Sequence, residues 1–297
     1  MRFLGAGGKM GFGRAAQGPW TPADLVDGRL WLDASDSSTI TLSGSSISLW
    51  EDKIGSNDAT DAVNSSNVTI TTARPTIATS AQNGLNAVAF NGSQWFDHGS
   101  SAGLLRNRSC AIMAMAYKFG DLFGRRLWNH WGNFSQYRFV YDVGFTLFGG
   151  SPVRGRAARL DTDNVTTAQT SGTGDTAPRN TNWCVTVIVM DYATNSLSMR
   201  ANGSIVATNN FPTGGANTSD TDIDTSVYNA GTAIGAAARN GGSAMSNGGR
   251  IGELVCGAKT SGSYATGDIE EVEGYLAHKW GLASLLPSTH TYKDSAP

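Results

Sequence analysis

The sequence predicts an all-β sandwich that ends in one short helix, and three observations support this prediction. Charged residues make up 15% of the 297-residue chain, whereas about a quarter is usual. Gly, Ser, Thr and Asn take their place, a composition that suits short strands and turns better than long helices. Alternating apolar and polar runs recur along most of the chain, and turn residues separate them. Helical spacing occurs near the C-terminus.

Residues 1–24 are predicted to form a glycine-rich arm, and residues 25–297 to form the sandwich domain. Six glycines fall within residues 1–19, and glycine at this density disfavours regular structure because each one is costly to order. The arm is either a disordered tail or an anchor that becomes ordered against a partner. Four apolar residues that a pure linker would not need favour the anchor: Phe3, Leu4, Met10 and Phe12. Glycines and a lysine interrupt the apolar stretch, so we expect no signal peptide.

Four segments predict strands in the first half of the domain. "GRLWLDAS" (28–35) and "SSISLWEDKIGSNDAT" (45–60) alternate apolar with polar residues, as half-buried strands do. "NAVAFNGSQWFDHG" (86–99) contains one strand, an Asn-Gly turn signal and a second strand. "CAIMAMAYKF" (110–119) is predicted to be a buried strand.

The second half continues the β pattern. Residues 127–149 are the aromatic centre of the chain and predict two or three strands. "NWCVTVIVMDYATNSLSMRANGSIVAT" (182–208) shows the clearest hairpin pattern, with an apolar strand ending at Asp191 and a second turn at Asn202-Gly203. "AGTAIGAA" (230–237) and "GRIGELVCGA" (249–258) predict two more short strands.

Residues 267–281 are predicted to form a helix. Ile269, Val272 and Leu276 recur at helical spacing. We expect Thr266 or Asp268 to act as the N-cap, and Gly281 can end the helix.

This helix raises the question of catalysis, because it contains four carboxylates followed by a histidine: Asp268, Glu270, Glu271, Glu273 and His278. Laminarinase-type glycosidases place their acids on one face of a strand, where alternate residues align. A helical period instead separates Glu271 from Glu270 and Glu273, and acids in the first turns favour the helix dipole. We therefore interpret the run as a helix start and expect no catalytic residue. The alternative is a polysaccharide depolymerase that uses Glu270, Glu271 or Glu273.

Charge and cysteine content exclude several other classes. The formal net charge is −2, whereas nucleic-acid binders usually carry a basic excess. No window approaches 18 apolar residues, so membrane insertion is not expected. Cys110, Cys184 and Cys256 are far apart and odd in number, which predicts buried free thiols.

Two segments are candidates for ligand binding. Aromatic side chains in residues 127–149 could stack against the apolar faces of sugars, although some of these rings are also needed to fill a core. The candidate rings are Trp128, His130, Trp131 and Tyr137.

A second group has the D-x-D-x-D spacing of a calcium loop: Asp220, Asp222 and Asp224. Thr225 and Gly231 stand where an EF-hand requires glycine and glutamate. The favoured interpretation is therefore an exposed polar loop, and an irregular calcium site is the alternative. We expect no other cofactor.

Several segments resemble the laminin-G-like and concanavalin A-like jelly-roll family. Residues 182–208 resemble its run from Trp through an apolar strand to Asp, then an alternating strand and an Asn-Gly turn. "TAIGAAARNGGSAMSNGGRIGELVCGA" resembles the next element, which contains Ile-Gly and Gly-x-Ile-x-Glu. "IEEVEGYLAHKWGLASLLPSTHTYKDSAP" resembles the tail of many phage and bacterial members, and "LWLDASDSSTI" resembles their opening. The leader "FLGAGGKMGFG" looks like the start of phage structural proteins.

The resemblance implies a two-sheet antiparallel jelly-roll sandwich of the concanavalin A-like/LamG-like type, with a short C-terminal helix and an extended N-terminal arm. It further implies a non-catalytic bacteriophage virion protein, on the capsid or the tail, that binds host-surface glycans or decorates the particle. Expected partners are other virion proteins through the arm, further copies of the chain, and a host glycan. A purely structural decoration protein without a ligand is the alternative.

Overall fold

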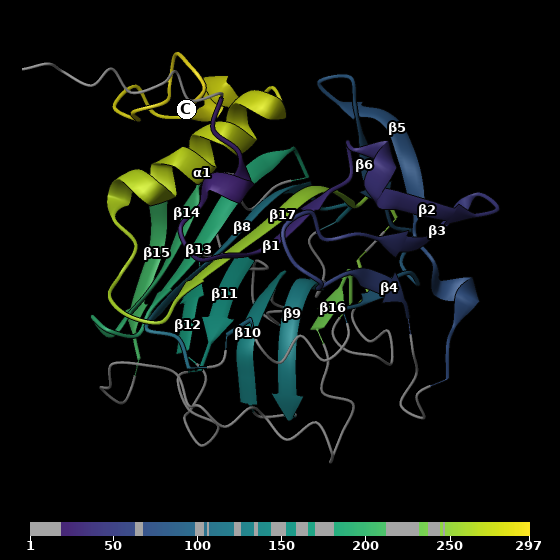
Figure 1. Ribbon diagram of the computed structural model, residues 1–297, viewed down its shortest axis with the longest axis horizontal. Coiled ribbons are helices and arrows are strands. Elements are labelled where there is room, and N and C mark those ends of the chain that lie inside the picture. Colours follow the sequence, from purple (N-terminus) through teal and green to yellow (C-terminus); the bar gives the residue numbers. More distant parts are fainter. Residues whose placement is uncertain are drawn as a thin grey trace, which may run out of the picture.

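The computed structural model describes residues 19–62, 68–98, 104–105, 107–121, 126–133, 136–143, 153–158, 166–169, 181–211, 232–236, 244–245 and 247–297. Antiparallel pairing connects the seventeen strands of this described chain. The strands form two layers, and helix α1 (Thr266–Lys279) packs on the outside of one of them (Figure 1). The predicted all-β jelly-roll sandwich with a C-terminal helix is confirmed.

The layer beneath α1, the helix-side layer, has neighbours that are far apart in the sequence. Its strands, in spatial order, are β1 (Gly28–Asp33), β17 (Arg250–Lys259), β8 (Cys110–Lys118), β13 (Cys184–Asp191), β14 (Ser196–Ala201) and β15 (Ser204–Asn210). The start of β17 also pairs with β6 (Leu85–Ala89), which pairs with β5 (Thr76–Gln82).

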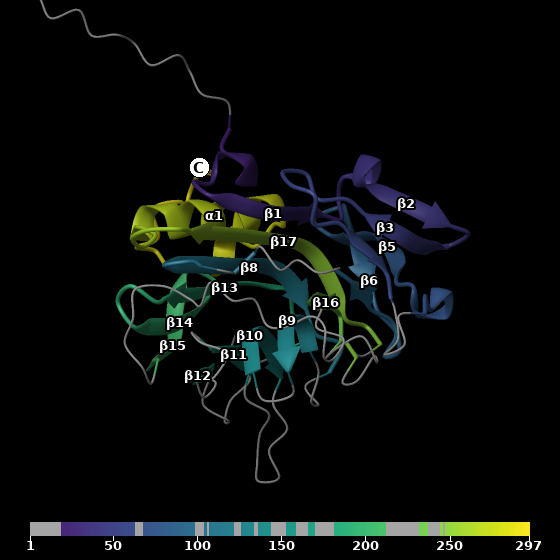
Figure 2. The ribbon, with the colours of Figure 1, turned by 60° about the horizontal axis from the view of Figure 1, so that its bottom comes forward.

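The second layer, the outer layer, lies on the side of the molecule away from α1 (Figure 2). Its strands, in spatial order, are β4 (Ala59–Asp61), β7 (Phe96–Asp97), β16 (Thr232–Ile234), β9 (Arg126–Asn133), β10 (Gln136–Val143), β11 (Val153–Ala157) and β12 (Thr166–Gln169). At one end β3 (Ser46–Trp50) joins β2 (Ile40–Ser43), β4 and β5. Four short 3₁₀ helices complete the described elements: Pro22–Asp24, Ser37–Thr39, Thr71–Ala73 and Ala283–Leu285.

Strand β8 shows how the sequence separates two hydrophobic cores. Met113 and Met115 face the main core between the layers, whereas Ala114 and Ala116 face the second core beneath α1. Alternate side chains of a strand point to opposite faces, so successive residues of β8 fill the two cores in turn. The predicted buried strand is confirmed.

The hairpin predicted over residues 182–208 is also confirmed, as β13, β14 and β15. Asn195 and Asn202 adopt positive φ angles of 61° and 48° at its two turns, a conformation that Asn tolerates better than most residues. The three cysteines are buried and free, as predicted.

Other strands were not anticipated. Residues 76–82, 153–157 and 166–169 gave no clear alternation, yet they form β5, β11 and β12. The Asn91-Gly92 turn does not close a hairpin either, because β6 pairs with β5 and β17, whereas β7 pairs with β4 and β16. Here the chain passes from one layer to the other.

The first described residues and the last residue of the chain meet on α1. The Trp20 backbone N–H donates to the Pro297 carbonyl at 3.3 Å, and the Trp20 ring packs edge-on against Tyr275 with 5.6 Å between ring centroids. Residues 19–24 thus pack on the domain. The boundary between an arm and the domain stays a prediction, and the anchor residues Phe3, Leu4, Met10 and Phe12 lie outside the described residues.

Candidate functional site

The acidic run at the start of α1 is a structural part of the fold. Asp268 accepts the backbone N–H of Ala265 at 3.0 Å, the contact that an acid three residues into a helix makes with its N-cap. Ala265 is the N-cap residue, and Thr266 opens the helix. The expectation of a Thr266 or Asp268 cap was therefore wrong, because the helix already begins at Thr266 and the N-cap is the residue before it.

Glu273 is buried and does not merely complement the helix dipole. Arg200 donates to its two carboxylate oxygens at 2.8 and 2.9 Å, in the bidentate geometry that suits a guanidinium. The His290 ring nitrogen lies 3.3 Å from Glu273 Oε2. Glu273 is only 1% exposed, so it fastens α1 to β14 and to the C-terminal tail and cannot reach a substrate.

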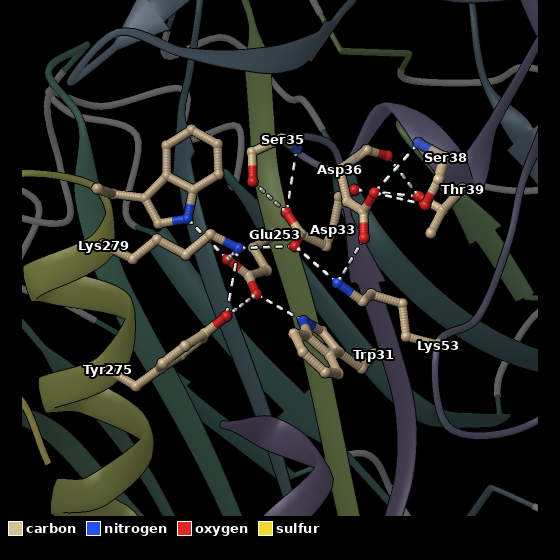
Figure 3. Close-up of polar contacts among 11 residues, drawn as sticks. Trp31, Asp33, Ser35, Asp36, Ser38, Thr39, Lys53, Glu253, Tyr275 and Lys279 are labelled. Carbon is tan, nitrogen blue, oxygen red and sulfur yellow. Dashed lines mark hydrogen bonds and ion pairs between the residues drawn. The ribbon is translucent and has the colours of Figure 1, made fainter. Parts of the chain in front are cut away.

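A second buried carboxylate, Glu253 on β17, collects four donors (Figure 3). The indole N–H of Trp31 on β1 donates to it at 2.6 Å and that of Trp280 at 2.9 Å. The Tyr275 hydroxyl donates at 2.9 Å, and Lys279 Nζ lies 2.8 Å from Oε2. Three of the donors come from α1 or its C-cap, so Glu253 pins the helix to the sheet.

Lys279 extends this network to Asp33 on β1. Its Nζ lies 2.8 Å from Asp33 Oδ2, and Lys53 Nζ reaches the same oxygen at 3.3 Å and Asp36 Oδ2 at 2.7 Å. Lys53 also stands over the Trp31 ring, 4.1 Å from its centroid. Carboxylates and ammonium groups therefore alternate from Glu253 to Asp36 (Figure 3).

The two carboxylates on Lys279 have pKa values shifted in opposite directions. Burial, followed by the nearby Asp33 charge, raises the pKa of Glu253. Burial also acts to raise the pKa of Asp33, but Lys279, Ser35 and Lys53 together lower it. Such divergence is typical of catalytic acid/base pairs. Here Glu253 is 0% and Asp33 3% exposed, so we interpret the pair as part of the fold.

Sequence reasoning did not single out Glu253. It lies in the apolar run "GRIGELVCGA", and a lone carboxylate in a buried strand must have donors. A lone carboxylate in an apolar strand was therefore the sequence signal that could have identified Glu253. Its partners occupy the segments that resemble the jelly-roll family, "LWLD" and "GYLAHKWGL". The network thus gives a physical reason for these residues at these positions.

The structure places one of the four predicted ligand-binding rings, Trp128, in the core, and it describes only the backbone of the other three. Trp128 is 0% exposed and belongs to the main core, so its ring does not lie on the surface. For His130, Trp131 and Tyr137 the structure describes the backbone alone, within β9 and β10, where Trp131 pairs with Tyr137. These three side chains remain predictions as ligand-binding groups.

The calcium candidate Asp220, Asp222 and Asp224 lies outside the described residues. Within the part of the chain that is described, no group of three or more His, Cys, Asp or Glu side chains could hold a metal ion. No helix in that part is long and apolar enough to span a membrane.

The sequence matches no protein-family model and no curated protein. The fold is similar to domain 4 of AbnA, a GH43 extracellular arabinanase from Geobacillus stearothermophilus solved in complex with arabinotriose. The identity is 13% and the TM-score 0.51, over 84% of this chain and 100% of that one.

Two further structures are more distant. The CBM40 of a Ruminococcus gnavus IT-sialidase gives 16% identity and a TM-score of 0.41, over 57% of this chain and 88% of that one. The binding domain of botulinum neurotoxin DC gives 10% and 0.43, over 86% and 52%. The likeness to the arabinanase domain supports the β-sandwich fold.

Proposed function

We propose that this protein is a non-catalytic, glycan-binding jelly roll carried on a phage particle. The N-terminal arm would fix it to other virion proteins, and the outer layer would meet the host surface. Many copies on one particle would raise the avidity of individually weak sugar contacts.

One observation carries the choice of binding over hydrolysis. The described carboxylates that most resemble an acid/base pair, Glu253 and Asp33, are sealed beneath α1 and hold it in place. Of the three acids of the depolymerase hypothesis, Glu273 is likewise buried against Arg200, whereas Glu270 and Glu271 are partly exposed on α1. A glycosidase needs carboxyl groups that reach the scissile bond from both sides.

The fold and the position of α1 favour the outer layer as the ligand face. α1 covers the helix-side layer, and residue 20 and the C-terminal residue meet on that same side (Figure 2). An arm leaving there would direct the outer layer away from the particle. The arabinanase domain that shares the fold was solved with arabinotriose bound, which supports sugar recognition by sandwiches of this kind. Trp131 and Tyr137, paired across β9 and β10, are our candidates for stacking against a sugar.

A glycan array with the full chain tests the proposal. We expect a concentration-dependent signal for at least one glycan class. Trp131→Ala should lose at least tenfold in affinity, because stacking of a sugar on the indole ring that contributes about 1.4 kcal/mol corresponds to a tenfold change in Kd. Trp20→Ala is the matched control, because it removes a tryptophan on the α1 side, and it should bind as the wild type does.

Two results would contradict the proposal in different ways. Absence of signal at every density would favour a decoration protein without a ligand. Sustained release of reducing ends from a polysaccharide, abolished by Glu271→Gln, would favour the depolymerase.

A further inference from the structure

We propose that the helix-side layer carries a second ligand site, in which Lys118 of β8 and Arg250 of β17 bind the carboxylate of an acidic sugar and Trp183 packs against its ring. The site goes beyond the proposed function, because it lies on the opposite layer from Trp131 and either site can exist without the other. Three features point to it: the register of the strands, the contacts that the two cations lack, and a stacked tryptophan pair.

Lys118 and Arg250 lie directly opposite each other in the sheet, on the side of α1. The register of β17 with β8 pairs the two residues. Ala116 of β8 belongs to the core beneath α1 and Tyr117 to the main core. Because alternate side chains point to opposite faces, Lys118 points to the α1 side, and Arg250 points the same way as its cross-strand partner. Both residues are partly exposed, and paired side chains of this kind start about 5 Å apart.

Neither cation has a carboxylate partner within the described chain. Lys118 forms no ion pair, hydrogen bond or cation–π contact with any residue that the structure describes. Arg250 donates from one guanidinium nitrogen to the Gly249 carbonyl at 2.7 Å, and burial alone lowers its pKa, without a contribution from any carboxylate. Like charges directly opposite in a sheet are destabilising. A bound anion would therefore stabilise this pair.

A tryptophan pair borders the two cations. The indole rings of Trp183 and Trp280 stack, with 5.4 Å between centroids and 12° between planes. Trp280 lies over Gly252 of β17, where a Cβ would be 2.5 Å from its ring, whereas Trp183 comes immediately before β13. Strand β8 lies between β17 and β13. The stacked pair therefore crosses β8 beside Lys118, which the register places opposite position 183.

Trp183 adds the groups that a sugar requires. Trp280 is buried and its N–H donates to Glu253 at 2.9 Å, so Trp183 rests on an anchored ring. Trp183 itself is partly exposed, and its indole N–H has no acceptor in the described part of the chain. An indole offers an apolar surface to a sugar ring and one donor to a hydroxyl, while the two cations match a carboxylate. A sugar that carries a carboxylate satisfies all of these groups, whereas a neutral sugar or a lone anion satisfies fewer.

Isothermal titration calorimetry of the full chain with tri-galacturonate tests the site. We expect binding that weakens with added salt, and at least a tenfold loss of affinity in the double variant K118Q/R250Q. Trp183→Ala should lose at least tenfold as well, because it removes the sugar-facing ring. Lys259→Gln is the matched control, since it removes a cation at the opposite end of β17, and it should bind as the wild type does.

Further variants separate lost binding from lost folding. K118Q/R250Q removes two adjacent like charges, so its melting temperature without ligand should equal or exceed that of the wild type. A clear fall in this temperature would show that the two cations have partners in the fold, and it would overturn the inference. K118R/R250K keeps both charges and should bind within about threefold of the wild type. Trp183→Phe keeps an aromatic ring and should bind more tightly than Trp183→Ala.

The outcomes also separate this inference from the proposed function. Equal affinity of K118Q/R250Q and wild type for tri-galacturonate overturns the inference, and so does equal or tighter binding of neutral maltotriose or of sulfate in parallel titrations. Trp131→Ala should bind tri-galacturonate as the wild type does. A tenfold loss there would place the acidic sugar on the outer layer, which overturns the inference and supports the proposed function. Neutral-glycan binding that is lost in Trp131→Ala, without binding of tri-galacturonate, would do the same.

Discussion

At the scale of single residues, the fold depends on carboxylates that are removed from water. Glu253 is fully buried, yet two indole N–H groups, a phenol and an ammonium group all point at it. A buried charge is tolerated when donors replace the lost water. Glu253 therefore requires hydrogen-bond donors at Trp31, Tyr275 and Lys279. A substitution at any of these positions should affect stability because it removes a donor from Glu253.

Replacing Glu253 tests this dependence. Glu253→Ala leaves the indole N–H groups and Lys279 buried with a lost partner, so the free energy of unfolding should fall by about 3–5 kcal/mol. Urea unfolding followed by circular dichroism measures it. Glu51→Gln, at an exposed carboxylate, is the control and should change it by less than about 0.5 kcal/mol. A loss below about 1 kcal/mol in Glu253→Ala would show that the network does not hold α1.

Asp36 makes the stability depend on pH at the acid end. A hydrogen bond from Lys53, then one from Ser38, lowers its pKa to about 2, whereas an unfolded aspartate titrates near about 3.9. Because the folded pKa is the lower one, Asp36 stabilises the fold above about pH 4 and loses this contribution as the pH falls towards 2. Asp36→Asn should show a shallower fall of the urea midpoint over that range. An unchanged slope would contradict the assignment.

At the scale of elements, α1 shows how much the sequence could predict. The period of Ile269, Val272 and Leu276 gave the helix, predicted over 267–281 and found over Thr266–Lys279. Gly281 ends it with a φ of +67°, as expected of a C-terminal glycine. The burial of Glu273 was not predictable from the period, because its partner Arg200 lies 73 residues away.

Two glycines in α1 give a matched pair of substitutions with opposite signs. Gly274→Ala would bring a Cβ within 2.5 Å of Tyr292 in the C-terminal tail, and overpacking of this kind costs about 1–3 kcal/mol. Gly267→Ala meets no atom within 4 Å, so its higher helix propensity should stabilise the protein by about 0.4–1 kcal/mol. Thermal unfolding measures both. Stabilisation by Gly274→Ala would show that the tail does not pack tightly on the helix.

At the scale of the whole molecule, the sequence predicted the sandwich more fully than its sites. Strands with regular alternation, such as "NWCVTVIVM", were identified correctly. The strand "VRGRA" was not, because five residues with a central glycine give too short a pattern. Its place between β10 and β12 follows from pairings that the sequence does not show. The acidic run was the catalytic candidate, whereas Glu253 was marked only by its apolar neighbours and by its place in the Gly-x-Ile-x-Glu motif.

The three thiols report on the whole fold at once. Cys110, Cys184 and Cys256 lie on the adjacent strands β8, β13 and β17. Burial raises the pKa of Cys184 to about 11 and that of Cys256 to about 12, which suppresses the reactive thiolate. We expect no reaction with a disulfide reagent at pH 8 in the native protein, and all three thiols to react together over the urea transition. Earlier reaction of one thiol would indicate local opening of its strand.

The pairing of β1 with β17 also constrains the order in which the chain can fold. Trp31 and Glu253 are separated by 222 positions, so β1 leaves the ribosome long before its only described neighbour in the helix-side layer exists. Until residue 253 has emerged, the apolar faces of β1 and β8 have no complete sheet to join. Pairings between distant segments fold slowly because loop closure must come first. The nascent chain therefore closes this sheet late, after β17 has emerged, and until then the exposed strand edges are open to aggregation.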